Sequence, residues 1–157
     1  MTRYPCHLYE IRDGKKAYEA MQMDFVKDYG DDVRLPGGKT LHDNYTWDDG
    51  GRCLLRCREC GGYFLCQSSE YHDMFDGPDG YYKDWIPAAS AEDADLLNIL
   101  LDVMEFENYP CRHLRRNNHD FFWTQGEEPI PHDLEALREK ILKKYPVEGI
   151  NELVDRK

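Results

Sequence analysis

Apolar side chains recur at three- and four-residue steps between Asp13 and Gly30, where Tyr18, Met21 and Phe25 follow one another. This spacing places them along one side of an α-helix, away from the charged residues between them. Gly30 is well placed to end such a helix, because glycine readily adopts the left-handed conformation that follows many helices. The pattern therefore predicts one helix over residues 13–30.

Short apolar and aromatic stretches predict strands elsewhere in the chain. Residues 4–12 hold Leu8 and Ile11 in an imperfect alternation and predict a first strand. Two further strands are expected at residues 81–86 and 121–123, which are rich in aromatic side chains. These strands are separated by turn-forming residues rather than by regularly placed helices.

Two helices in the second half of the chain have clear start signals. Ser90 precedes Asp93 by three positions, a variant of the capping box in which each side chain bonds the other residue's backbone. A broad apolar face follows, made of Leu96, Leu97, Leu100, Leu101 and Met104. The final helix is expected within residues 131–146, with the acidic Asp133 near its start and the basic Lys143 near its end, as the helix dipole favours.

These elements together predict a single α+β domain over residues 1–157. The sheet is expected to be antiparallel, with a hairpin over residues 52–72 as its most regular part and about three helices packed against it. Runs of strands joined by hairpin-like turns argue against the alternating strand–helix order of a parallel sheet. A chain of 157 residues with 41% apolar residues is long enough to form one core.

The predicted hairpin, "RCLLRCRECGGYFLCQSSEYH", contains four of the six cysteines. Cys57 and Cys60 are separated by two residues and followed by two glycines. Thiolates at this spacing can converge on one metal ion, and glycines allow the chain to fold around it. Cys53 and Cys66 lie symmetrically on the two arms and would face each other, as small apolar core residues or, in an oxidising compartment, as a disulfide.

The stretch "CRECGGYF" resembles the knuckle of zinc ribbons and rubredoxin-like folds, in which C-x-x-C-G is followed by an aromatic residue. The resemblance implies a metal-binding turn, with Zn²⁺ as the expected ion. A zinc ribbon normally has a second C-x-x-C, which this chain lacks, so the remaining ligands must come from less regular positions. A thioredoxin-like redox role is disfavoured, because glycines and aromatic residues rather than a helix-forming sequence follow the motif.

The two remaining ligands have several candidates. Cys111 with His113 is the pair that we assign, because alternate residues of an extended stretch share a face. If that stretch were helical, the two side chains would diverge, and Cys6, which follows Tyr-Pro as Cys111 does, would become the better partner. His7 and His72 are further candidates. The predicted metal ligands are therefore Cys57, Cys60, Cys111 and His113.

The chain is strongly acidic, with 31 Asp and Glu residues against 20 Lys and Arg residues and a formal net charge of −11. Such a charge disfavours binding to nucleic acid or to an anionic membrane and favours a basic protein partner. A basic stretch from Arg112 to Arg116 keeps nucleic-acid binding as an alternative, although pairing with nearby carboxylates explains these arginines better. The first residues contain no apolar signal segment and the longest apolar run is too short for a bilayer, so we expect a cytoplasmic protein with reduced thiols.

These features predict a non-enzymatic, cytoplasmic binding protein in which a structural zinc knuckle holds an acidic scaffold in shape. Small acidic proteins of bacteria often neutralise cationic nuclease toxins, and this chain is similar to such immunity proteins in size and charge. The alternative is a metal-dependent hydrolase or nuclease-like enzyme that uses the knuckle metal with His113 or His119. Four protein ligands to the metal would favour the binding protein, and three ligands with a water molecule would favour the enzyme.

Overall fold

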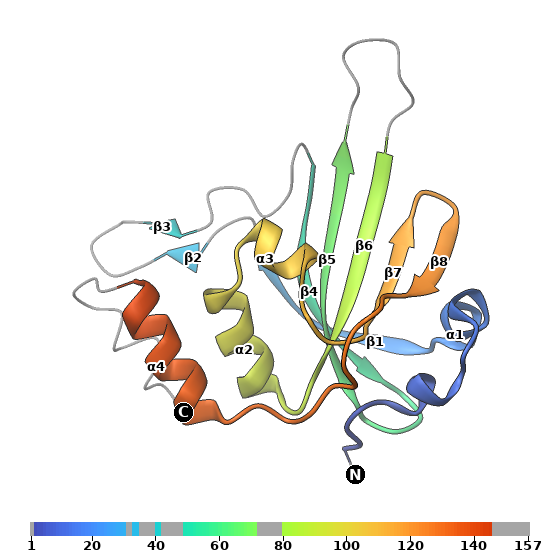
Figure 1. Ribbon diagram of the computed structural model, residues 1–157, viewed down its shortest axis with the longest axis horizontal. Helices are drawn as coiled ribbons and strands as arrows, with labels where there is room; N and C mark the ends of the chain where they lie inside the picture. The colour runs from blue at the N-terminus through green and yellow to red at the C-terminus, as the bar shows by residue number, and fades with distance from the viewer. Residues whose placement is uncertain (1, 31–32, 35–39, 42–48, 72–79, 146–157) are drawn as a thin grey trace.

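Six antiparallel strands form the main sheet, in the order β1-β4-β5-β6-β7-β8 (Figure 1). The computed structural model describes residues 2–30, 33–34, 40–41, 49–71 and 80–145. The predicted α+β fold with an antiparallel sheet is confirmed, and a second small sheet pairs β2 with β3. The strands are β1 (Met23–Gly30), β2 (Val33–Arg34), β3 (Thr40–Leu41), β4 (Asp49–Cys57), β5 (Tyr63–Tyr71), β6 (Gly80–Ala88), β7 (Leu114–Asn117) and β8 (Asp120–Trp123).

The predicted cysteine hairpin is formed by β4 and β5, which pair in continuous antiparallel register with Cys53 directly opposite Cys66. His72, at the end of the predicted hairpin, lies outside the described residues. The strands predicted at residues 81–86 and 121–123 are confirmed, since they fall within β6 and β8. The hairpin lies inside the sheet, with β1 beside β4 and β6 beside β5.

Both predicted helices begin where expected, but the reciprocal half of the box predicted at Ser90 differs, since the Asp93 carboxylate accepts from the Ala89 N–H and not from that of Ser90. The Ser90 hydroxyl accepts a hydrogen bond from the Asp93 backbone N–H at 3.1 Å, and the Asp133 carboxylate caps the last helix. Both caps provide partners for backbone N–H groups that have none within the helix. The helices are the 3₁₀-helix η1 (His7–Glu10) and the α-helices α1 (Gly14–Ala20), α2 (Ala91–Leu100), α3 (Val103–Glu107) and α4 (Leu134–Lys144).

The apolar face predicted after Ser90 does not continue through one helix. Leu101 is extended, and Asp102 starts α3 through a capping box with Glu105. This break changes the direction of the chain, so Met104 is 49% exposed instead of buried.

The helix predicted for residues 13–30 is wrong in its second half. α1 ends at Ala20, Met21 is already extended, and the chain continues as the edge strand β1. Phe25 and Val26 suit a pleated sheet, and hydrogen bonds to β4 replace those of a helix. Both side chains are exposed, at 63% and 44%, so the spacing in the sequence does not mark a buried helical face.

The strand predicted for residues 4–12 is wrong as well, because this segment contains η1. Leu8 and Tyr9 are neighbours in the sequence and both are buried in the same core. A strand would direct neighbouring side chains to opposite faces, whereas a tight helical turn allows both to contact one surface. The Tyr9 ring stacks on Phe64 of β5 with 6.5 Å between ring centroids, which holds this segment against the sheet.

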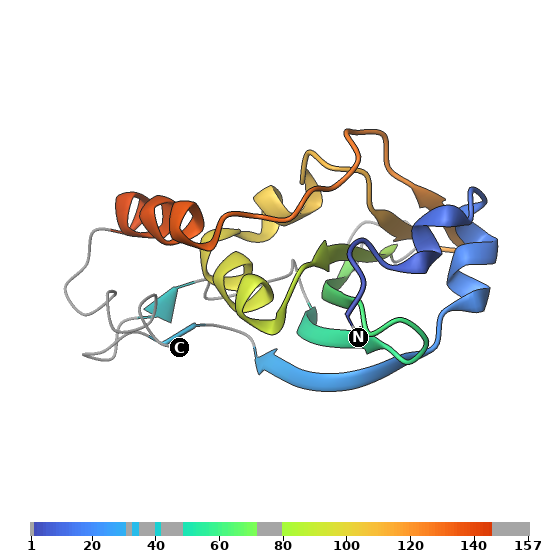
Figure 2. The same cartoon turned by 90° about the horizontal axis from the view of Figure 1, so that it is seen from below.

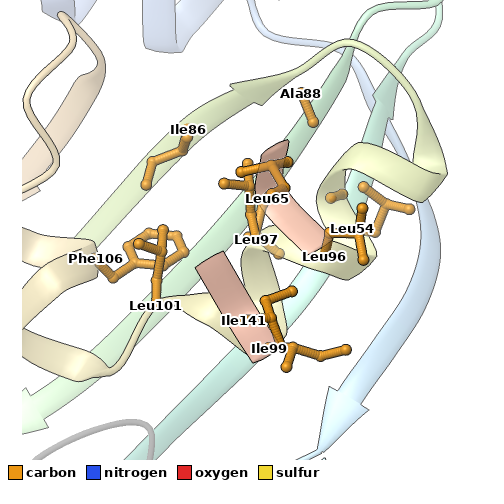
Figure 3. Packing of buried hydrophobic residues seen from close by; sticks show 12 residues of the cluster. Leu54, Leu65, Ile86, Ala88, Leu96, Leu97, Ile99, Leu101, Phe106 and Ile141 are labelled. Carbon is orange, nitrogen blue, oxygen red and sulfur yellow. The ribbon is translucent and has the colours of Figure 1, made fainter. Parts of the chain in front are cut away.

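The sheet separates two apolar cores, because neighbouring residues of its strands face opposite sides. Helices α2, α3 and α4 gather on one side, and η1 with α1 on the other (Figure 2). In the first core, Leu65 and Ile86 of the sheet meet Leu97 of α2 and Ile141 of α4 (Figure 3). The second core lies under η1 and α1 and contains several cysteines.

Candidate metal centre

Three cysteines and a histidine from two distant segments meet at the turn between β4 and β5. The sulfur atoms of Cys6, Cys57 and Cys60 and a ring nitrogen of His7 all lie within 4.8 Å of one another. The two sulfurs of Cys6 and Cys60 are 3.3 Å apart. His7 Nδ1 lies 3.5 Å from Cys6 Sγ and 3.7 Å from Cys57 Sγ. Within the described residues, this group could hold one metal ion through four protein ligands.

The turn that carries Cys57 and Cys60 is closed by its own backbone. The Cys57 N–H donates to the Gly62 carbonyl at 2.8 Å, and the Gly61 N–H donates to the Cys57 carbonyl at 2.9 Å. Gly61 has a φ of 76°, in the left-handed region that glycine adopts without steric cost. Cys57 ends β4 and no helix starts at Cys60, so the pair lacks the helix N-terminus of a thioredoxin-like redox site.

The N-terminal segment provides the other two ligands by packing directly on this turn. The Arg3 N–H donates to the Cys60 carbonyl at 3.1 Å. A Cβ atom at Gly62 would lie 2.8 Å from the Arg3 carbonyl oxygen and 3.1 Å from Cys6 Cβ, so a larger residue would push this segment away. Cys6 is the N-cap residue of η1, and the buried Leu8 follows it. The group therefore joins the start of the chain to the middle of the sheet.

The thiols of the group differ in how readily they ionise. Burial opposes ionisation of Cys60, but hydrogen bonds from the His7 ring and from the backbone N–H groups of His7 and Gly62 outweigh it and lower the pKa of this thiol to about 6. Burial raises the pKa of the Cys6 thiol, which is 2% exposed. Because metals bind thiolates, a bound cation would have to displace the proton of Cys6, whereas Cys60 is largely ionised at neutral pH.

Glu59 lies against the outer edge of the His7 ring. Its carboxylate Oε2 lies 3.0 Å from His7 Nε2, while His7 Nδ1 faces the sulfur atoms. In a metal-bound state the ion would replace the hydrogen bond between the ring and the Cys60 thiolate, and a proton on Nε2 would leave the Nδ1 electron pair for the metal. Carboxylates in this position orient metal-binding histidines and make them more basic. Glu59 is therefore placed to orient the His7 ring.

Cys111 and His113, the other two ligands that the sequence pattern suggested, are not brought to this group. Their stretch is not helical, and Cys111 pairs its backbone with Glu127. The buried His113 uses both ring nitrogens, since Nε2 lies 2.9 Å from Asp84 Oδ1 and Nδ1 lies 3.0 Å from the Cys111 carbonyl oxygen. Arg115 donates to the same Asp84 oxygen at 2.6 Å. His113 therefore acts as an internal partner for a buried carboxylate.

The arginines of the basic stretch also have partners within the chain. The Arg112 guanidinium donates to Glu128 Oε1 at 2.7 Å, and Arg115 is paired with Asp84. Arg116 donates from Nε to a backbone carbonyl at 2.7 Å and lies over aromatic rings. The contacts with Glu128 and Asp84 agree with the carboxylate pairing expected from the sequence.

The sequence left Cys6 and His7 as open alternatives and did not identify Glu59. The signals that favour the first two are the Tyr-Pro that precedes Cys6 and the adjacent histidine. His119 is exposed near the turn that joins β7 and β8, and His72 lies outside the described residues. The position of Glu59 between the two knuckle cysteines is the only indication of its role that the sequence contains.

None of the helices in the described part of the chain is long and apolar enough to cross a membrane. No protein-family model matches the chain, and no curated protein and no solved structure is significantly similar to it. The geometry of this centre is therefore the feature of the molecule that points to a function.

Proposed function

We propose that the protein is a non-enzymatic binding module whose fold is completed by one structural Zn²⁺ held by Cys6, His7, Cys57 and Cys60. The observation that carries this proposal is the convergence of four donor atoms within 4.8 Å of one another. Structural zinc sites are closed by four thiolate or imidazole ligands, whereas catalytic sites keep one position for water or substrate. A site that already has four protein donors favours the structural role.

The separations between His7 Nδ1 and the sulfurs suit one tetrahedral ion, and the separation of the Cys6 and Cys60 sulfurs is shorter than such a site has. Zn–S bonds of about 2.3 Å and Zn–N bonds of about 2.0 Å place two sulfurs about 3.8 Å apart and a sulfur and a nitrogen about 3.5 Å apart. The two distances from His7 Nδ1 to sulfur are 3.5 and 3.7 Å, and the sulfurs of Cys6 and Cys60 are 3.3 Å apart. Three thiolates and one imidazole in tetrahedral geometry are typical ligands of zinc.

Metal analysis of the purified full-length chain tests this proposal. We expect one zinc per chain in the wild type and a large loss of zinc in Cys60→Ser, because the remaining donors would leave one position open. Cys111→Ser is the matched control, since it removes a cysteine outside the group and should keep its zinc. Cobalt in place of zinc should give the visible absorption of a tetrahedral thiolate site. Unchanged zinc content in Cys60→Ser would contradict the proposal.

We further propose that this module binds a basic protein, in the way that small acidic immunity proteins bind cationic nuclease toxins. The formal net charge of −11 supports this, because opposite charges speed the encounter of two proteins and help to select the partner. Exposed aromatic side chains supply anchors for binding. Phe25 and Phe122 are 63% and 40% exposed, whereas Trp85 is buried. The two phenylalanines are therefore better anchors for a partner than that tryptophan.

Affinity capture at two salt concentrations tests the basic partner. We expect the immobilised protein to retain a protein with an excess of Lys and Arg at low salt and to release it at high salt. A column that carries an unrelated protein of equal negative charge is the control. Capture of the same proteins on both columns would show that charge alone explains the binding and would contradict a specific partner.

A further inference from the structure

Cys53 and Cys66 form a second pair of thiols, which does not belong to the metal-binding group. Cys53 in β4 lies directly opposite Cys66 in β5, and the two side chains are hydrogen-bonded to each other. Both pack in the second core, under the N-terminal helices. The structure thus holds two thiols in contact across neighbouring strands.

The register of the two strands suits a covalent bridge. Residues directly opposite each other in an antiparallel pair have Cα atoms about 4.5 or about 5.5 Å apart, depending on the backbone hydrogen bonds at that position. Disulfides span Cα separations of about 4.4–6.8 Å. Both values for an opposed pair fall within this range, so Cys53 and Cys66 can be joined by rotation of their side chains alone.

The two thiols differ in access and in charge environment. Cys66 is 1% exposed and burial raises the pKa of its thiol, whereas Cys53 is half-buried. The hydrogen bond from Cys66 lowers the pKa of Cys53, and the positive charge of Lys83 in β6 adds to this effect against burial and Asp28. The accessible thiolate of a pair is the one that an oxidant reaches first.

We propose that Cys53 and Cys66 are an oxidative modification site, at which hydrogen peroxide converts the two thiols into a cross-strand disulfide. The Cys53 thiolate attacks one peroxide oxygen, the O–O bond breaks, and the sulfur becomes a sulfenic acid, while the departing hydroxide takes up the proton that the thiol had lost and leaves as one water. The Cys66 thiol then attacks this sulfur, and the hydroxyl group leaves with the thiol proton as a second water. Each sulfur gives up one electron, and the peroxide accepts both.

The site is independent of the proposed zinc centre. Cys53 is four positions from Cys57 in the sequence, and its partner Cys66 lies on the other strand of the hairpin. Zinc bound to Cys6, Cys57 and Cys60 would protect those thiolates, so oxidation at Cys53 and Cys66 would proceed without loss of metal. Measurement of metal content before and after oxidation therefore separates failure of this proposal from failure of the zinc proposal.

Peroxide treatment of the reduced full-length chain, followed by denaturing alkylation and peptide mass mapping, tests the site. We expect a mass loss of about 2 Da and a peptide that joins Cys53 to Cys66, with Cys111 still alkylated. In Cys66→Ser, Cys53 should stop at the sulfenic acid and react with dimedone. In Cys53→Ser, Cys66 should remain a thiol. Cys111→Ser is the matched control and should form the same bridge as the wild type.

Two results would overturn the proposal. One is that Cys53 and Cys66 are both alkylated after peroxide treatment, and the other is a disulfide that joins either of them to a different cysteine. Serine at the buried position 66 could prevent folding. In that case the wild-type peptide map and the Cys53→Ser variant, which alters the more accessible position, still decide the question.

Discussion

At the scale of single residues, the metal-binding group depends on close contacts that only particular side chains allow. Gly62 leaves space for the Arg3 carbonyl, which would lie 2.8 Å from any Cβ atom at that position. The Glu59 carboxylate lies 3.0 Å from the outer nitrogen of His7, and the inner nitrogen of the ring faces the sulfurs. These two residues do not bind the metal in our proposal, yet they decide whether the ligands are correctly placed.

Replacement of Glu59 by alanine is expected to weaken metal binding about 10- to 100-fold while the protein remains folded. The Glu59 side chain is 55% exposed, so its removal disturbs little packing, but the His7 ring loses the partner that fixes its orientation. Competition with a coloured chelator measures the affinity. Glu59→Gln should lose less metal affinity, because its amide oxygen can still accept a hydrogen bond from the ring. Glu139→Ala on α4 is a surface control. Equal affinities for Glu59→Ala and wild type would show that the contact has no role.

The residues of the centre were only partly predictable from the sequence. Cys57 and Cys60 could be identified because both ligands lie in one short turn, where spacing alone sets their geometry. Cys6 and His7 could not be selected over Cys111 and His113, because their distance from that turn depends on how η1 packs on the sheet. The ring nitrogens of His113 have partners on β6 and near Cys111, which no local pattern reveals.

At the scale of elements, helix caps were more informative than apolar spacing. Ser90 marks the start of α2 because capping requires a particular side chain at a particular position, and Asp133, expected only as an acidic residue near a helix start, is the cap of α4. The apolar residues between Met21 and Gly30 fit a helix and a strand equally well over this short distance. Pairing with β4 decides between them, and that partner is more than twenty positions away in the sequence.

The pairing of β6 with β7 also places a buried carboxylate between two basic side chains. Asp84→Ala is expected to lower the free energy of unfolding by about 3–5 kcal/mol, because His113 and Arg115 would lose their buried acidic partner. Asp84→Asn should cost less, since its amide oxygen still accepts a hydrogen bond. Urea unfolding measures both, with the exposed Asp120→Ala in β8 as the control. If Asp84→Ala lowered the free energy of unfolding no more than the control does, the buried carboxylate would not be required for stability.

At the scale of the whole molecule, the metal-binding group connects the start of the chain to the middle of the sheet, in addition to the hydrogen bonds and side-chain packing between them. The first residues of the chain reach the turn between β4 and β5, and η1 and α1 then cover the second core. The other side of the sheet is covered by α2, α3 and α4, which have no residue in the group (Figure 2). Loss of metal should therefore affect one side of the sheet more than the other.

Removal of the metal with a strong chelator is expected to lower the thermal midpoint and to loosen the N-terminal segment first. A ligand present at about 1,000 times its dissociation constant stabilises a fold by about 4 kcal/mol. Removal of zinc from such conditions should lower the free energy of unfolding by an amount of this order. Amide hydrogen exchange should rise at Tyr9, whose N–H donates to the Cys6 carbonyl at 3.0 Å, and change little at Leu137 in α4. Restored zinc should reverse both effects. Equal changes at the two amides would contradict a local role for the metal.

The order of the ligands along the chain also has a consequence for how the protein is made. Cys6 and His7 are synthesised before Cys57 and Cys60, and the segments that form α1 and β1 are made between them. Two donors alone bind an ion far more weakly than four, so the nascent chain can capture zinc firmly only once the hairpin has emerged. Closure of the centre thus has to follow emergence of the turn between β4 and β5, and it can come before the last helix, α4, is made.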